Sequence, residues 1–154
     1  MEQKIEALGD KDSSELDQRR AWVYGTNASA SDFTSVEEKL DLLAAMLNSG
    51  LIKPNHEWQL KSLGVVFGDV LAQSLDVVWV IVEDEYGRSA ALMVPQTTIL
   101  LFPITALLKR LEDGEEVDVR DLYSGFYDRV ITLKKQGVSR RRSRVRARRP
   151  RQSS

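Results

Sequence analysis

The chain has 154 residues, of which 42% are hydrophobic and 29% are charged. This length and composition predict one soluble globular domain and exclude a disordered chain. The absence of cysteine excludes disulfides, a thiol nucleophile and thiolate metal sites, and the single histidine, His56, excludes paired-histidine metal sites. No stretch approaches the roughly 18 apolar residues of a membrane span, and the start of the chain lacks a secretory signal. We therefore expect a cytoplasmic protein that does not associate with membranes.

The net charge of −1 averages two different segments. Residues 1–139 hold 14 basic and all 23 acidic side chains, which gives a formal charge of −9. The other eight basic residues form a tail: Arg140, Arg141, Arg142, Arg144, Arg146, Arg148, Arg149 and Arg151. An acidic body repels nucleic acid and attracts basic partners. We divide the chain into a flexible N-terminus (1–12), a single acidic domain (13–138) and an arginine-rich disordered tail (139–154).

Hydrophobic periodicity predicts three helices in the first half of the domain, over 13–24, 35–49 and 56–75. A loop over 26–32 separates the first two. The second begins with a capping box, in which the Ser35 hydroxyl and the Glu38 carboxylate each bond a free amide. Gly64 and Gly68 lie four residues apart in the third helix, where each costs about 1 kcal/mol relative to alanine. This spacing indicates a strand or helix that crosses close to the backbone there.

The period then changes to that of strands, which predicts a meander over 77–102. Val77 to Val82 suit a central strand, Ala90 to Val94 the return strand, and Thr98 to Phe102 a third. Connections this short require antiparallel pairing. The turn at Glu83 to Arg88 contains Gly87, which is free to adopt positive φ.

Two further helices are predicted, over 103–112 with Pro103 in the first turn and over 119–135 with Asp118 as cap. The fold class is therefore α+β: helices, a three-stranded antiparallel meander, then two helices. The predicted core consists of Leu40, Leu43, Leu47, Leu63, Phe67, Leu71, Trp79, Ile81, Leu100, Phe102, Leu107, Leu111 and Phe126.

Several of these motifs occur in an order that resembles an uncharacterised bacterial group, domain-of-unknown-function family 3806. They are Leu63-Gly64-Val65-Val66-Phe67-Gly68-Asp69, Trp79-Val80-Ile81-Val82-Glu83-Asp84-Glu85-Tyr86-Gly87-Arg88, Leu100-Leu101-Phe102-Pro103 and Gly114-Glu115-Glu116-Val117-Asp118-Val119. The resemblance implies a compact helix–meander–helix domain of bacterial origin. It carries over no activity, and the arginine tail has no counterpart in the family pattern.

The carboxylates at the predicted hairpin are the nearest approach to a chemical site. Glu83 and Glu85 face the same side if strand geometry persists, and such a pair can hold Mg²⁺ or share a proton. We favour an ordinary exposed turn, because no third ligand lies nearby. Tyr86 and Arg88 make this turn a candidate contact surface, since both residue types are frequent at binding hot spots. Glu112, Asp113, Glu115 and Glu116 form a second candidate patch.

The sequence lacks the residues and motifs that other catalytic and phosphate-binding sites require. His56 is expected to be an exposed first-turn residue, and no nucleophile elbow or phosphate-binding glycine loop is present. A polar stripe on the third helix suits either a polar pocket or a solvated face: Gln59, Ser62, Asp69 and Gln73. We assign no catalytic residue, cofactor or metal.

The sequence therefore predicts a non-enzymatic bacterial protein-binding domain, specifically an immunity protein that neutralises a basic toxin encoded nearby. Its predicted contact residues are those of the two patches, Glu83, Asp84, Glu85, Tyr86 and Arg88 with Glu112, Asp113, Glu115 and Glu116. Two alternatives remain open: a small-ligand or metal-binding domain, and a polyanion-binding protein that contacts nucleic acid only through its tail.

Overall fold

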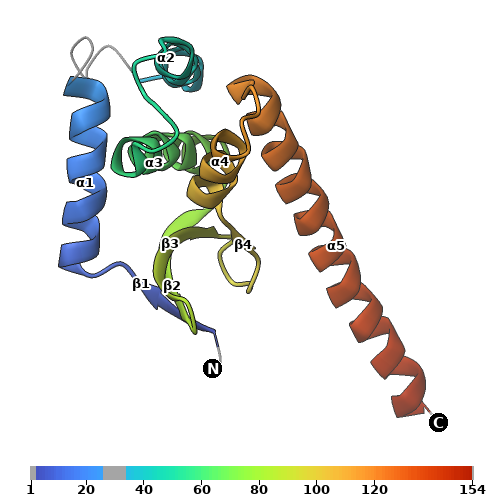
Figure 1. Ribbon diagram of the computed structural model, residues 1–154. Coiled ribbons are helices and arrows are strands. Elements are labelled where there is room, and N and C mark those ends of the chain that lie inside the picture. Colours follow the sequence, from blue (N-terminus) through green and yellow to red (C-terminus); the bar gives the residue numbers. More distant parts are fainter. Residues whose placement is uncertain (1–2, 26–33, 154) are drawn as a thin grey trace.

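The computed structural model describes the backbone of residues 3–25 and 34–153, and the side chains of these residues up to 136. Over this part the chain is α+β, as predicted, with five helices and a four-stranded antiparallel sheet (Figure 1). In chain order the elements are β1 (Lys4–Ala7), α1 (Asp10–Gly25), α2 (Val36–Asn48), α3 (Glu57–Ser74), β2 (Val78–Asp84), β3 (Gly87–Met93), β4 (Leu100–Leu101), α4 (Pro103–Glu112) and α5 (Val119–Ser153). The loop predicted over 26–32 lies outside the described residues.

The first strand corrects the prediction of a flexible N-terminus. β1 pairs antiparallel with β2, with Lys4 opposite Glu83 and Ala7 opposite Val80, so the sheet has four strands and not three. The segment has only four residues, Lys-Ile-Glu-Ala, and is too short and too polar to show the alternating hydrophobic pattern of a strand. They become a strand because the open edge of β2 supplies hydrogen-bond partners, which is a tertiary effect.

The rest of the meander follows the predicted order. β2 and β3 are joined by a turn at Glu85 and Tyr86, and Gly87 has φ 116°, the positive value expected for it. The last strand is shorter than the predicted 98–102, with only Leu100 and Leu101 paired to β3. It ends early because Phe102 already caps α4, whose first residue is Pro103, as the sequence predicts.

Two predicted helix caps are confirmed. Ser35 accepts a hydrogen bond from the Glu38 amide at 3.1 Å, and the Glu38 carboxylate accepts one from the Ser35 amide at 3.2 Å. At the start of α5 the Asp118 carboxylate accepts bonds from the amides of Arg120 and Asp121 at 3.1 and 3.2 Å. Each cap satisfies amides that have no partner within the helix.

The two glycines of α3 mark the predicted close approach, and both a helix and a strand make it. A β-carbon added at Gly64 would lie 2.8 Å from the Ile104 α-carbon of α4. One added at Gly68 would lie 2.3 Å from the ring of Trp79, which comes from β2. Only glycine permits these distances, so the pair fixes how α3 meets α4 and the sheet.

The core surrounds α3, which contacts α1, α2, α4 and α5. Seven of the thirteen predicted core residues are buried: Leu40, Leu43, Leu63, Phe67, Leu71, Ile81 and Leu107. Four of the remaining six are partly buried against this core: Leu47, Trp79, Leu111 and Phe126. The other two, Leu100 and Phe102, are partly buried against a second, smaller cluster formed by Val80, Val82 and Ala91.

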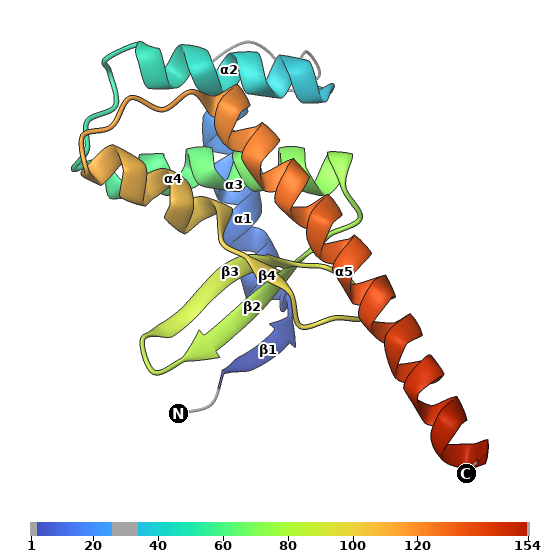
Figure 2. The ribbon, with the colours of Figure 1, turned by 90° about the vertical axis from the view of Figure 1, so that its right-hand side faces the viewer.

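The last helix is longer than predicted. The sequence places its end at Gln136-Gly137, whereas α5 continues to Ser153 and leads the chain away from the other elements (Figure 2). This helical backbone differs from the disordered tail expected for 139–154. Arginine and alanine favour helices, and a single glycine such as Gly137 does not end a helix that has already begun. The side chains of the tail lie outside the described residues.

Candidate functional site

The turn between β2 and β3 presents the first predicted patch. Asp84 ends β2, and its Oδ1 accepts a hydrogen bond from the Tyr86 amide at 2.8 Å. This bond stabilises the two-residue turn from within and uses one of the predicted contact carboxylates. The Tyr86 side chain projects from the turn and is 89% exposed. The hairpin therefore presents an aromatic ring on a turn that is stabilised by a hydrogen bond within the turn.

Arg88 has a structural role in addition to its predicted one. Its guanidinium contacts both carboxylate oxygens of Asp12, at the start of α1, at 3.3 Å each. A hydrogen bond from the Gly9 amide, reinforced by Arg88, lowers the pKa of the Asp12 carboxyl below its ordinary value. The ion pair ties the hairpin to α1. Because the Arg88 side chain is still 48% exposed, it also remains open to a partner.

The hairpin carboxylates do not form the paired site that strand geometry would have given. β2 ends at Asp84, so Glu85 lies in the turn, whereas Glu83 lies on the strand between Lys4 and Arg88. The described residues contain no group of three His, Cys, Asp or Glu side chains that could hold a metal ion. Glu83 and Glu85 therefore lie in a strand and a turn, respectively, and not as a pair on one strand.

The second predicted patch, Glu112, Asp113, Glu115 and Glu116, lies where α4 connects to α5. All four residues are exposed, and Glu115 forms an ion pair with Arg110 at 3.6 Å. The connection lies beside α2, whereas the hairpin lies at the far end of the sheet beside the N-terminus (Figures 1 and 2). The two patches are therefore separate surfaces.

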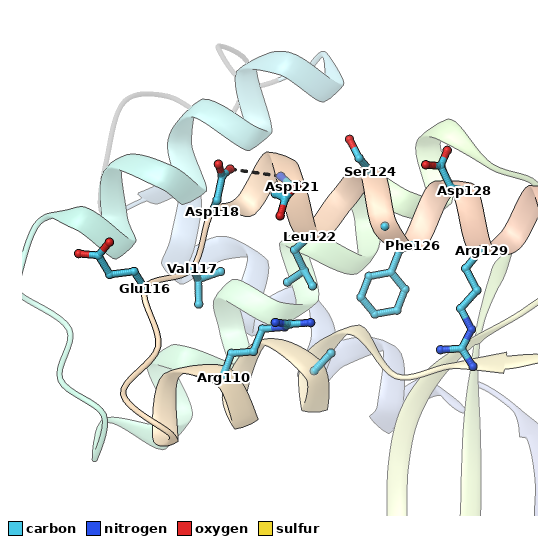
Figure 3. Close-up of a pocket in the computed structure, with 12 residues that line it drawn as sticks. Arg110, Glu116, Val117, Asp118, Asp121, Leu122, Ser124, Phe126, Asp128 and Arg129 are labelled. Atoms are coloured by element: carbon cyan, nitrogen blue, oxygen red, sulfur yellow. Dashed lines mark hydrogen bonds between the residues drawn. The ribbon is translucent and has the colours of Figure 1, made fainter.

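A groove of about 650 Å³ adjoins the second patch, between α4 and α5 (Figure 3). Glu116 is the only predicted site residue that lines it. The apolar lining is Ala106, Val117, Leu122, Gly125 and Phe126; the polar lining is Arg110, Glu116, Asp118, Asp121, Ser124, Asp128 and Arg129. Arg110 extends from α4 toward Leu122, and Phe126 and Arg129 project from α5 on the α4 side, whereas Ser124 and Asp128 project away. Sequence reasoning missed this groove because its two walls meet only in the folded chain.

Most of the polar stripe of α3 forms hydrogen bonds within the protein, and its remaining residue, Gln59, lines a small pocket with Trp22. Asp69 accepts two hydrogen bonds from Arg20 of α1, at 2.7 and 2.9 Å, and a third from the Trp79 indole at 2.9 Å. These bonds raise the pKa of the Arg20 guanidinium. Gln73 contacts Lys39 and the Thr34 carbonyl, and Ser62 is buried and donates to the Trp58 carbonyl. The stripe therefore connects α3 to α1, α2 and the sheet.

His56 also has a structural position. It caps α3 without a side-chain bond to that helix, and its Nδ1 accepts a hydrogen bond from the Lys53 amide at 3.0 Å. The side chain is partly buried and not fully exposed as predicted, because the Lys53–His56 turn folds it back toward a small apolar pocket. That pocket, of about 380 Å³, is lined largely by Trp22, Met46, Leu51 and Ile52.

A third groove, of about 270 Å³, lies between α1, α3, β3 and α4. Most of its charged side chains are already bound within the protein. Arg88 pairs with Asp12, Lys61 pairs with Glu57 at 2.8 Å, and Arg19 donates to the Trp58 carbonyl at 2.9 Å. This groove thus offers little free charge to a ligand.

Within the described ranges, no helix is both long enough and apolar enough to cross a membrane. The fold is similar to that of a protein from Bacteroides thetaiotaomicron VPI-5482, whose crystal structure was determined at 1.50 Å resolution, with a TM-score of 0.72 and 14% sequence identity. The similarity covers 84% of this chain and 48% of that protein, so this chain spans about half its length. At this identity the similarity establishes the fold alone.

No curated protein is significantly similar to this sequence. The sequence model of the family described as "Domain of unknown function (DUF3806)" matches residues 39–123, from within α2 to the first turns of α5. This segment holds the two glycines of α3, the hairpin and the connection between α4 and α5. Because the match extends over more than half of its 154 residues, the chain belongs to the DUF3806 family.

Proposed function

We propose that this protein is a non-enzymatic protein-binding domain that acts as an immunity protein, and that it neutralises a basic toxin. The observation that carries the proposal is the Tyr86 side chain, 89% exposed at the tip of the β2–β3 hairpin. Tyrosine is enriched at binding hot spots, and here the exposed ring lies at the tip of a hairpin turn. The neighbouring carboxylate of Glu85 is also exposed.

The bracing of the turn supports the same role. Asp84 holds the Tyr86 amide, and Arg88 ties the hairpin to Asp12. Because the backbone is held in the free protein, little conformational entropy is lost when the turn binds. Tyrosine adds contact area with only two side-chain torsions to fix.

The charge of the body supports a basic partner. Residues 1–139 carry a formal charge of −9. Such a charge accelerates the encounter with a positively charged protein and slows encounters with nucleic acid. Toxins that act on nucleic acid present basic surfaces, which an acidic partner can cover.

The carboxyl groups with shifted pKa values have structural roles. The pKa values of Asp12, Glu38 and Glu57 are all lowered, through a backbone bond, a helix cap and an ion pair with Lys61, respectively. A carboxyl group that acts as a general acid at neutral pH needs a raised pKa. The shifts seen here instead accompany bonds that stabilise the fold.

The test is co-expression of the chain with the product of the adjacent gene. The proposal predicts rescue from toxicity and a complex that co-purifies. Tyr86→Ala combined with Glu85→Lys should abolish both. Leu51→Ala is the matched control, because Leu51 is 80% exposed but lies on the α2–α3 connection, away from the hairpin. A harmless neighbour would contradict the immunity role, and a complex unchanged by the hairpin variant would contradict the proposed surface.

A further inference from the structure

The groove between α4 and α5 carries negative charge that the described part of the protein does not neutralise. Four acidic residues border it, Glu116, Asp118, Asp121 and Asp128, of which Asp128 projects away, and the guanidiniums of Arg110 and Arg129 lie against the other three. Asp118 is engaged as the cap of α5, and Arg110 pairs with Glu115, which does not line the groove.

Glu116 and Asp121 are the carboxylates most available to a ligand. Neither forms an ion pair or side-chain hydrogen bond with the residues that the structure describes, and both are exposed. Between them and Arg129 the groove presents the apolar surface of Val117, Leu122 and Phe126. A cationic side chain with a planar, weakly hydrated head group suits such a mixture, because guanidinium forms paired bonds with carboxylate and also stacks on aromatic rings.

The chain itself contains a segment of this chemistry. Eight arginines between Arg140 and Arg151 nearly balance the −9 of residues 1–139. We propose that the groove between α4 and α5 binds the arginine-rich C-terminal segment of a second copy of this chain. This self-association is separate from toxin binding at the hairpin.

The direction of α5 favours binding between two copies over binding within one. α5 supplies one wall of the groove, from Asp121 to Arg129, and then leads away from α4 and the sheet (Figures 1 and 2). At 1.5 Å per residue, Arg140 begins about 20 Å beyond Phe126 along the same helix. A continuous helix cannot return to its own start, whereas two antiparallel copies of α5 place each basic end beside the acidic groove of the other.

Such an arrangement is closed by a two-fold axis, since each copy gives one tail and receives one. It therefore predicts a dimer and not an open polymer. Because it depends on exposed charges, the dimer should be strong at about 0.1 M salt and weak at about 1 M, where the screening length falls from about 10 Å to about 3 Å.

The experiment measures the mass of the full chain in solution by sedimentation over a dilution series, after nuclease treatment, at both salt concentrations. The wild type should be a dimer at low salt. Replacement of all eight tail arginines by glutamine, which keeps a similar helix propensity, should give a monomer. Glu116→Gln with Asp121→Asn should weaken the dimer about tenfold.

The matched control is Asp10→Asn with Glu85→Gln, which removes the same charge from α1 and the hairpin and should leave the dimer unchanged. A monomeric wild type at low salt would overturn the proposal, as would a dimer that survives loss of the tail arginines. Equal weakening by the groove pair and the control pair would show that only net charge matters, which also overturns it. A wild-type monomer that binds added RNA or DNA would assign the tail to nucleic acid instead.

Discussion

The region around Asp69 in α3, which we call the inner region, and the tip of the β2–β3 hairpin each place an aspartate beside an aromatic residue. The aromatic ring is packed against the helix in one region and exposed in the other. In the first, the Asp69 carboxylate binds the Arg20 guanidinium and the Trp79 indole, and thereby holds an aromatic ring against the helix. In the second, the Asp84 carboxylate binds the Tyr86 backbone amide and leaves the aromatic ring outside.

The difference shows what a carboxylate beside an aromatic residue does in each setting. Where the carboxylate binds the ring, the ring becomes part of the packing and its loss destabilises the fold. Where the carboxylate binds the backbone, the turn is stabilised and the ring is free to contact a partner. We therefore expect substitutions in the first region to lower stability, and substitutions at Tyr86 to affect binding alone.

The largest expected effect is at Phe67, two residues before Asp69 in α3. Phe67 is completely buried and packs edge-on against Phe126, so Phe67→Ala should lower the free energy of unfolding by about 3–5 kcal/mol. Tyr86→Ala should change it by less than about 0.5 kcal/mol. Urea denaturation measures both variants, and comparable losses would break the contrast between the two regions.

A methyl group added at Gly68 should have the next largest effect. It would meet the Trp79 ring at 2.3 Å, and that ring is also held by Asp69, so Gly68→Ala should cost about 2–3 kcal/mol. Gly125→Ala in α5 is the control, because its added methyl meets no atom within 4 Å. That variant should gain up to about 1 kcal/mol from helix propensity. Similar thermal midpoints for the two variants would refute the close crossing.

Asp69→Asn tests the polar part of the inner region. It removes charge from bonds to Arg20 and Trp79 that are mostly shielded from water, so a loss of about 2 kcal/mol is expected. Asp17 binds the same Arg20 at 2.8 Å but is 73% exposed, so Asp17→Asn should cost no more than about 0.5 kcal/mol. Equal losses in denaturation would show that burial does not distinguish the two carboxylates.

The smallest effect concerns pH and the link between the hairpin and α1. The pKa of Asp12 is lowered in the folded protein, so its contribution is present above its unfolded pKa of about 4 and is lost as the pH falls below that value. The thermal midpoint should therefore decrease between about pH 5 and pH 3, and decrease less in Asp12→Asn. An identical pH dependence for wild type and variant would contradict this role for Asp12.

The predictable features of this fold are those that depend on near neighbours in the sequence. The capping box at Ser35 and Glu38 and the two-residue turn before Gly87 are local, so spacing alone indicates them. The close crossing at Gly64 and Gly68 is predictable in the same way, because glycine weakens a buried helix unless another element packs against its backbone. The partners in that crossing, Ile104 and Trp79, were not predicted.

The features that sequence reasoning missed join distant parts of the chain. Asp69 binds Arg20 across 49 residues, and Arg88 binds Asp12 across 76. β1 is a strand only because β2 lies beside it. For the candidate site, the exposed turn was predicted, whereas the anchoring of Arg88 and the groove between α4 and α5 depend on helix packing, which no local pattern encodes.

The most direct test of the account is the dissociation constant of the complex with the product of the adjacent gene, measured by calorimetry for the wild type and Tyr86→Ala. The thermal midpoint of each free protein is measured on the same samples. The account predicts that Tyr86→Ala weakens the complex at least about thirtyfold, the effect of a hot-spot residue, while the midpoint stays unchanged. Equal affinity of the two proteins, or a loss of affinity accompanied by a lower midpoint, would contradict it.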